Sequence, residues 1–199
     1  YIPIFYQAAQ HSSAITSGID LLPFVLGVAL TSLICGQIVS QFGFYWPFLA
    51  VAPFFLSIGS RLLYSLDTTT SNSKVVGFQI LCGIGTGLGM QNSLLALQVE
   101  FKDEPSLIGQ AMSLGRNTWF LGGTLGLGIA EPLFASQLSN YLLRYAPDAP
   151  ASIVRESPTS IYTELPAAMI PGVVKAYTAS LNIVFLVGVP VGEFIVRMC

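Results

Sequence analysis

The sequence predicts an all-α membrane protein, a polytopic bundle of helices, because of its composition and the spacing of its charges. Of the 199 residues, 53% are hydrophobic and only 9% are charged, and the mean hydropathy is +0.69. Soluble domains carry roughly 25% charged residues, so a soluble fold of this length could not bury so much apolar surface. Residues 21–60 and 75–99 contain no Asp, Glu, Lys or Arg. Apolar stretches of that length are candidates to cross a bilayer.

Five full transmembrane helices are predicted, together with the end of a sixth. The full spans lie at about 18–41, 46–66, 74–98, 107–135 and 173–196. Each provides the roughly 20 residues that cross a hydrocarbon core about 30 Å thick. Backbone polar groups find no water in lipid, so these stretches are helical. Residues 1–9 are apolar but too short to span, and no initiator Met precedes them, so we expect a partial span whose beginning has been cut.

Residues 136–172, before the last span, are predicted to form a long polar loop that contains five prolines. Within this loop Leu138, Tyr141, Leu142 and Tyr145 recur at helical spacing. That spacing indicates an amphipathic segment lying along the membrane interface. We favour a structural cover for the bundle over a lid that closes on a ligand.

Metal binding, nucleic-acid binding and enzyme chemistry are not expected. His11 is the only histidine, and the cysteines Cys35, Cys82 and Cys199 have no metal-ligand or redox spacing. A net charge of −2 and the lack of a basic tract argue against nucleic acid as a partner. A single histidine beside a short helix does not favour a catalytic triad. We therefore predict no metal, no cofactor and no enzymatic activity.

Glycine marks the third and fourth full spans. The glycines of interest are Gly83, Gly85, Gly87 and Gly89 in the third span, and Gly122, Gly123 and Gly126 in the fourth. Small residues spaced four apart let helix backbones approach closely. A nucleotide-binding loop is excluded because no strand precedes these glycines. We favour tight helix packing over direct contact with a ligand.

Arg116 is the charged side chain that the span predictions place deepest in the bilayer. It lies about ten residues into the fourth full span, and a helix rises about 1.5 Å per residue, so it is expected near the midplane. An arginine at that depth costs at least roughly 2.5 kcal/mol, so it needs a partner or a watered cavity. We treat Arg116 as a functional candidate. The alternative is a structural role, with the guanidinium held by carbonyls or by an acid on a neighbouring helix.

Other polar or aromatic side chains are candidates for contact with a substrate or a coupling ion. They are Asn117, Trp119, Gln7, Gln79, Gln91 and Asn92. For the three amides of the third span, hydrogen bonding between helices is the favoured role. The acids Asp20, Glu131 and Glu193 fall nearer the ends of spans, where they can reach the interface, so proton carriage is the less favoured interpretation for each.

Five segments together resemble one family of membrane transporters, in order and spacing. They are Tyr1–Ala8, Ser17–Phe24, Gly36–Pro47, Gly77–Gln91 and Gly115–Leu127. The chain resembles the C-terminal half of a major facilitator superfamily transporter. It is most similar to the fungal fourteen-span drug:proton antiporter group, which includes toxin efflux pumps. Each segment is weakly diagnostic alone, whereas the ordered set covers nearly the whole chain.

The resemblance implies a helical half-bundle that pairs with an absent N-terminal half and binds substrate near the midplane between the two halves. It also implies that Arg116 lines the central cavity. The stretch from Gly36 to Gly43 resembles the cytoplasmic-loop motif of the family, which often holds an acid and a base. Ser40 and Gln41 occupy that region here, so the sequence does not support a charge relay in this loop.

The predicted function is secondary active transport, namely proton-coupled efflux of small amphiphilic molecules such as drugs or toxins. No cofactor is implied beyond the proton gradient. The expected partners are the lipid bilayer, the N-terminal half and the substrate, and the expected location is the plasma membrane or the vacuolar membrane. Two alternatives remain open: uptake of a polar solute or an iron chelate, and a truncated remnant that does not transport. A membrane-embedded enzyme is less favoured than either.

Overall fold

The computed structural model describes the backbone of residues 1–156 and 158–198, and their side chains except those of residues 152, 156 and 188–198. The described residues form helices and no strand, so the predicted all-α class is confirmed. The helices are α1 (Ile2–Ala9), α2 (Ala14–Ile19), α3 (Leu22–Phe42), α4 (Trp46–Tyr64), α5 (Asn72–Glu100), α6 (Pro105–Tyr145), α7 (Ala151–Glu156), α8 (Ser160–Glu164) and α9 (Ile170–Met198).

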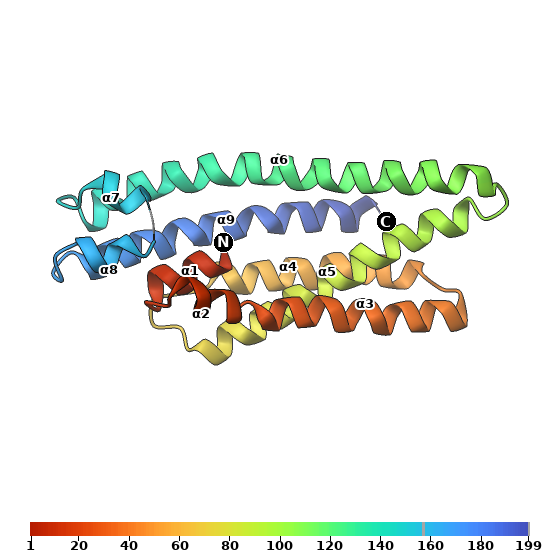
Figure 1. The fold of residues 1–199 in the computed structure, drawn as a ribbon, viewed down its shortest axis with the longest axis horizontal. Coiled ribbons are helices and arrows are strands. Elements are labelled where there is room, and N and C mark those ends of the chain that lie inside the picture. Colours follow the sequence, from red (N-terminus) through yellow and green to blue (C-terminus); the bar gives the residue numbers. More distant parts are fainter. Residues whose placement is uncertain (157, 199) are drawn as a thin grey trace.

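The long helices run side by side as a bundle (Figure 1). Four stretches of the described chain are long and apolar enough to cross a membrane: Ala14–Phe42, Trp46–Tyr64, Asn72–Glu100 and Ile170–Val187. They overlap four of the five predicted full spans. The remaining predicted span, the fourth at 107–135, lies in α6, where glycines, Arg116 and Asn117 lower the mean hydropathy.

Helix α5 holds the bundle together through close backbone contacts with α3 and α4. A Cβ atom built on Gly83 would lie 2.6 Å from the carbonyl oxygen of Phe24 in α3. A Cβ on Gly85 would lie 2.7 Å from the backbone nitrogen of Leu56 in α4, and one on Gly87 would lie 2.7 Å from the carbonyl oxygen of Val28 in α3. These three positions therefore leave no room for a side chain unless a helix moves. A Cβ on Gly89 would meet only the Ala52 Cβ, at an ordinary 3.6 Å.

Two glycines of the predicted loop motif lie at the end of α3. Gly43 ends the helix in the left-handed conformation, with φ +75°, and its amide donates to the carbonyl oxygen of Val39 at 2.8 Å. Glycine adopts that conformation at no steric cost, which explains a sharp stop here. A Cβ on Gly36 would meet nothing within 4 Å among the described atoms.

Helix α6 corrects the predicted boundary between the fourth span and the polar loop. Residues 138–145 are helical, as their spacing predicted, but the prediction that they belong to a loop separate from the fourth span is wrong, because α6 continues without a break to Tyr145. At about 1.5 Å per residue its 41 residues extend over roughly 60 Å. A stripe of buried residues four apart packs this end of α6 on α9 and accounts for its continuation past Pro132. The stripe consists of Ala130, Phe134, Leu138 and Leu142.

Residues 146–156 and 158–169, with α7 and α8, form a cap over the ends of α1 and α9 rather than a free polar excursion. Val154 and Ile161 are fully buried, and Leu165 is nearly so. The Tyr177 hydroxyl of α9 donates to the carbonyl oxygen of Val154. The rest of the predicted loop is therefore a packed cover, which is the arrangement that the sequence favoured over a ligand lid.

Tyr162 fastens this cap to α1. Its hydroxyl donates to the carbonyl oxygen of Ala8 at 2.7 Å, and its ring stacks on His11 with centroids 3.9 Å apart. Burial raises the pKa of the Tyr162 phenol, because removal from water penalises the phenolate. The associated stability is fully present below the ordinary tyrosine pKa of about 10 and is lost only as the pH rises through the higher folded-state pKa.

We expect Gly83→Ala to destabilise the bundle, because the new Cβ would strike the backbone of α3. Overpacking of this kind costs about 1–3 kcal/mol. Gly77→Ala in the same helix is the matched control, since a Cβ there meets nothing within 4 Å of the described atoms, and Ala is favoured over Gly in helices by up to about 1 kcal/mol. Thermal melting of the purified gene product in detergent would measure both. A Gly83→Ala variant that melts at or above the wild-type temperature would contradict the close packing of α5.

Candidate functional site

A partly buried polar cluster joins α1 to α5. The Tyr6 hydroxyl donates to Asn72 Oδ1 at 2.9 Å and accepts a hydrogen bond from Gln79 Nε2, also at 2.9 Å. Tyr6 and Gln79 are both fully buried. We call Tyr6, Asn72 and Gln79 the α1–α5 polar cluster. Hydrogen bonds between side chains of different helices are a recognised way to hold transmembrane helices together.

Gln79 keeps one unused hydrogen-bonding atom inside this cluster. Its Oε1 has no partner among the described residues. A buried acceptor without a partner costs about 1–3 kcal/mol, so the cluster can accept a hydrogen bond from a water, a proton carrier or a solute donor. Asp20, which ends α2, acts electrostatically on Tyr6. The cluster therefore combines an open acceptor with a nearby carboxylate.

Gln7 follows Tyr6 on α1 but hydrogen-bonds to α2 and not to this cluster. Its Nε2 donates to the Oγ of Ser17 at 2.9 Å, and that hydroxyl donates to the carbonyl oxygen of Ala14 at 3.0 Å. Ser17 is fully buried. Gln7 thus ties α1 to α2, whereas the preceding residue, Tyr6, ties α1 to Gln79 of α5.

The two other amides of α5 lie further along that helix. Asn92 is fully buried and donates to the carbonyl oxygen of Leu88, one turn earlier in its own helix, at 2.7 Å. Its Oδ1 has no partner among the described residues. The donor of Asn92 therefore does not make the bond between helices that the sequence favoured. Gln91 is half-buried.

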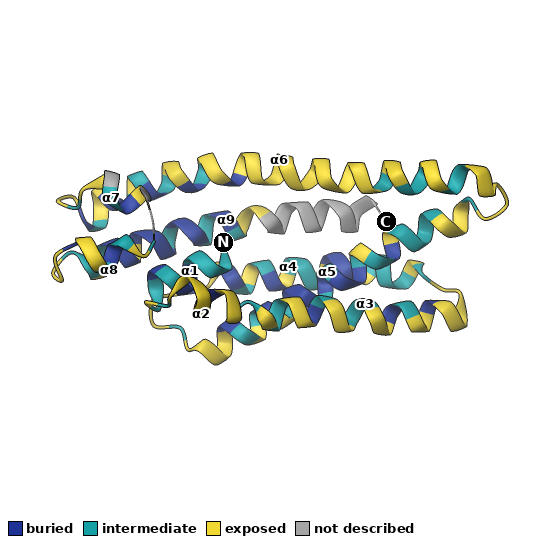
Figure 2. Ribbon diagram, in the orientation of Figure 1, coloured by how far each residue is buried: buried dark blue, intermediate teal, exposed yellow. Residues whose placement is uncertain are grey.

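Arg116, Asn117 and Trp119 lie on a part of α6 that the rest of the described chain leaves uncovered. Every residue from 116 to 129 is exposed, which Figure 2 shows as a yellow stretch along the middle of α6. A cavity of about 340 Å³ opens beside Arg116 and Asn117, and its described lining comes from α6 alone. Arg116 has no ion-pair partner among the described side chains.

The glycines of α6 differ from those of α5. A Cβ on Gly122, Gly123 or Gly126 would meet nothing within 4 Å among the described atoms. The helix packing predicted for these glycines is therefore not found within this part of the chain, because α6 packs through Gly115 on α5 and through its C-terminal stripe on α9. The region between those two contacts lacks a described neighbour.

The structure thus separates the sequence candidates into two groups. Gln79 belongs to the α1–α5 polar cluster and Gln7 bonds α1 to α2, whereas Arg116, Asn117 and Trp119 share the open face of α6. Tyr6 and Asn72 were not predicted, because a tyrosine in an apolar run and an asparagine before a span carry no signal of a contact 66 residues apart. Among the predicted acids, Glu131 accepts from the Tyr1 hydroxyl at 3.2 Å. The side chains of Glu193 and Cys199 lie outside the described residues.

Comparison with curated proteins finds transporters that resemble the chain over nearly its whole length. The chain is 36% identical to the MFS-type transporter pigP of Monascus ruber, over 98% of this chain and 34% of that protein. The chain is thus similar to transporters of the major facilitator superfamily. It is also 33% identical to the efflux pump roqT of Penicillium rubens, over 95% of this chain and 35% of the pump. The MFS-type efflux pump MFS1 of Trichophyton rubrum is 33% identical over 92% of this chain and 34% of the pump.

The chain spans about a third of the length of those relatives. The predicted family resemblance is confirmed. The relatives are named as transporters and pumps, in agreement with the expectation that the chain is not an enzyme. No family model matches the chain, and no solved structure matches it.

We expect Tyr6→Phe to destabilise the contact of α1 with α5. The change keeps the ring but removes the hydroxyl, which leaves Asn72 Oδ1 and Gln79 Nε2 without this partner at a cost of about 1–3 kcal/mol. Tyr45→Phe is the matched control, because no hydrogen bond joins the Tyr45 hydroxyl to the described residues. A double-mutant cycle of Tyr6→Phe with Gln79→Leu, followed by thermal melting, should give a coupling free energy. Strictly additive effects would show that the bond contributes nothing.

Proposed function

We propose that the protein containing this chain exports small amphiphilic molecules by secondary active transport driven by a proton gradient. The observation that carries the proposal is the uncovered face of α6, where a midspan arginine lies without an ion-pair partner among the described residues. A charge at that depth is not stable against lipid. The face therefore suits a watered cavity closed by a part of the protein outside this chain.

The composition of this face fits an amphiphile. Arg116 and Asn117 supply a cation and hydrogen-bonding groups, while the neighbouring Trp119 and Phe120 are 51% and 63% exposed, with ring centroids 5.7 Å apart. An arginine binds anionic or hydrogen-bonding heads, and aromatic rings bind apolar bodies. A molecule with one polar end and one ring system matches both parts of the face.

We infer the direction of transport from the names of the relatives. The names of roqT and MFS1 describe efflux pumps. By analogy we assign export to the protein that contains this chain, and we assign the second wall of the cavity to an N-terminal half of the kind that superfamily transporters possess. We place the protein in the plasma membrane, and fluorescence microscopy of a tagged gene product would distinguish that location from the vacuolar membrane.

Proton coupling is assigned to the α1–α5 polar cluster and its neighbour Asp20. An antiporter needs a group that gains and loses a proton as the substrate site opens to either side. Asp20 is a half-buried carboxylate within electrostatic reach of Tyr6, and Gln79 Oε1 is an unused acceptor in the same cluster. These groups support a proton pathway on the α1 side of the bundle.

The test is efflux of a fluorescent amphiphile from vesicles that contain the gene product, with and without an imposed pH gradient. Export that depends on the gradient and stops on addition of an uncoupler supports the proposal. An absence of export across a broad panel of substrates, from protein shown to be folded and inserted, would overturn it.

We expect Arg116→Ala to lower efflux roughly tenfold or more while leaving membrane insertion intact, because it removes a charge from the cavity wall and not from the core. Arg116→Lys should retain part of the activity, since the charge remains but the planar fork of donors is lost. Arg61→Ala is the control, because Arg61 is exposed in the last turn of α4. Initial efflux rates normalised to inserted protein measure all three. Wild-type efflux by Arg116→Ala would return this arginine to a structural role.

A further inference from the structure

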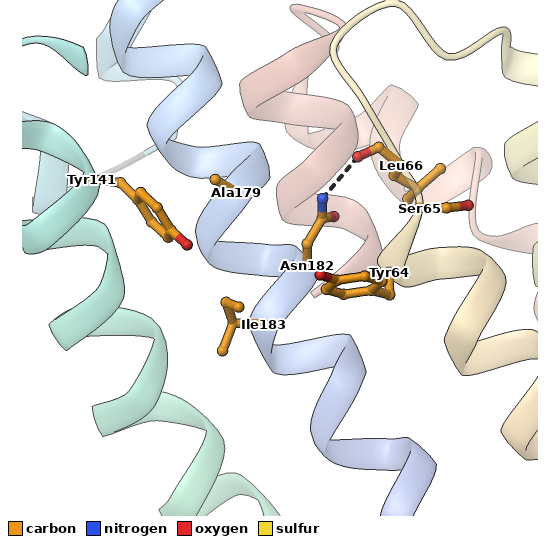
Figure 3. A pocket seen from close by; sticks show the side chains of 7 residues that line it. All are labelled: Tyr64, Ser65, Leu66, Tyr141, Ala179, Asn182 and Ile183. Atoms are coloured by element: carbon orange, nitrogen blue, oxygen red, sulfur yellow. Dashed lines mark hydrogen bonds between the residues drawn. The ribbon is translucent and has the colours of Figure 1, made fainter. Parts of the chain in front are cut away.

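A second cavity, away from both groups of candidate residues, lies where the end of α4 meets α6 and α9. Its volume is about 240 Å³. Its described lining comes from Tyr64 and the two residues after it, from Tyr141 of α6, and from one face of α9 (Figure 3). No described residue of α1, α2 or α5 lines it. The cavity is therefore separate from the α1–α5 polar cluster and from the open face of α6.

Two tyrosine hydroxyls converge on this cavity. Figure 3 shows the rings of Tyr64 and Tyr141 on two sides of α9, with the Tyr141 hydroxyl turned toward α9 and the Tyr64 hydroxyl beside Asn182. Neither hydroxyl has a hydrogen-bond partner among the described residues. Each can donate one hydrogen bond and accept others. The pair can therefore bind a single hydroxyl group placed between them.

Asn182 adds an unused acceptor at the cavity wall. Its Nδ2 donates to the carbonyl oxygen of Leu66 at 2.9 Å, which fixes the amide, while its buried Oδ1 has no partner among the described residues. The amide therefore keeps an unused acceptor for a donor that enters the cavity. The remaining lining consists of the aliphatic Leu66, Ala179 and Ile183 and of Ser65, whose hydroxyl donates to the carbonyl oxygen of Leu62.

The lack of charged side chains in the described lining indicates which kind of ligand the cavity suits. No described residue that lines the cavity is charged. The nearest cations along α6 and α9, Arg144 and Lys175, lie over the Tyr145 ring, 5.6 Å and 4.8 Å from its centroid. A phosphate head would find no cation in the cavity, whereas a neutral hydroxyl would find two hydroxyls and an amide.

We propose that this cavity binds the hydroxyl end of a neutral, ring-containing amphiphile, the chemistry of a membrane sterol. Tyr64 is the last residue of α4, so the cavity lies at a helix end, where tyrosines meet the membrane interface and where the hydroxyl of a sterol lies. The hydroxyl binds between Tyr64 and Tyr141, and the first ring packs on Ile183 and Ala179. The rest of the molecule lies along α9 in the bilayer.

The test uses the gene product in nanodiscs and a photoactivatable sterol that keeps its hydroxyl, with mass spectrometry to locate the label. Labelling is expected on peptides that contain Tyr64 or Tyr141. Ala179→Phe fills the cavity and should reduce this labelling roughly tenfold. Val187→Phe adds the same bulk to α9 outside the lining, at a residue 37% exposed, and should leave labelling unchanged.

A volume-conserving variant keeps the test valid if Ala179→Phe does not fold. The double change Tyr64→Phe with Tyr141→Phe removes only the hydroxyls and should reduce labelling by the hydroxyl-bearing probe roughly fivefold. A probe that lacks the hydroxyl should label wild type and double variant equally weakly. Equal labelling by the two probes, or undiminished labelling of the filled or double variant, would overturn the assignment.

Competition distinguishes two sources of the same chemistry. Displacement of the probe by unlabelled membrane sterol identifies a resident lipid, and displacement only by an exported hydroxyl-bearing amphiphile identifies cargo. Either result supports a hydroxyl-binding site. Binding is measured without a gradient, so its outcome does not depend on the proposed efflux activity.

Discussion

The close approach of α5 to α3 and α4 is the constraint on which the rest of the structure depends. Lipid is as apolar as a leucine side chain, so helices in a bilayer associate through packing and hydrogen bonds and not through the hydrophobic effect. Gly83 and Gly87 bring α5 against the backbone of α3, while Gly85 brings it against α4. With α5 fixed, Gln79 lies where Tyr6 can reach it. Helix α9 packs on α4, and α6 packs on α9.

The two glycine-rich helices show that glycine permits close packing without causing it. In α5 the glycines face backbones of neighbouring helices, whereas in α6 Gly122, Gly123 and Gly126 face no described atom within 4 Å. The difference arises because α6 is held only near its two ends, by Gly115 against Leu97 of α5 and by the buried stripe against α9. The same uncovered surface carries Arg116, which the span prediction places near the bilayer midplane, where a charge facing lipid is costly.

Sequence alone predicted the features that depend on local composition. Helix class and the positions of most spans follow from length and hydropathy, which are properties of short windows. The spacing of Leu138 and Leu142 indicated a helical segment, but Pro132 and the polar residues beyond it suggested that this segment was separate from the fourth span. Packing of Leu138 and Leu142 on α9 explains why α6 continues through it. The bond of Tyr6 to Gln79 joins residues 73 apart. No periodicity encodes such a contact, so the cluster needed a structure to reveal it.

The cap is hydrogen-bonded to the rest of the bundle, whereas the open face of α6 has no such bond among the described residues, and this difference constrains the proposed transport cycle. Tyr162 joins the cap to the end of α1 through Ala8, and α1 is joined to α5 through Tyr6 and Gln79. The cap, α1 and the glycine-packed helices are therefore mechanically linked. Arg116 belongs to a helix whose middle has no such link to the rest of the described chain. If a substrate binds at Arg116, protonation near Asp20 can affect it only by shifting α1 and α5 relative to α6, because no described hydrogen bond connects the two groups. Coupling in this half would then be a movement of one packed unit against α6, and the contact of Gly115 with Leu97 is the point where α6 touches that unit.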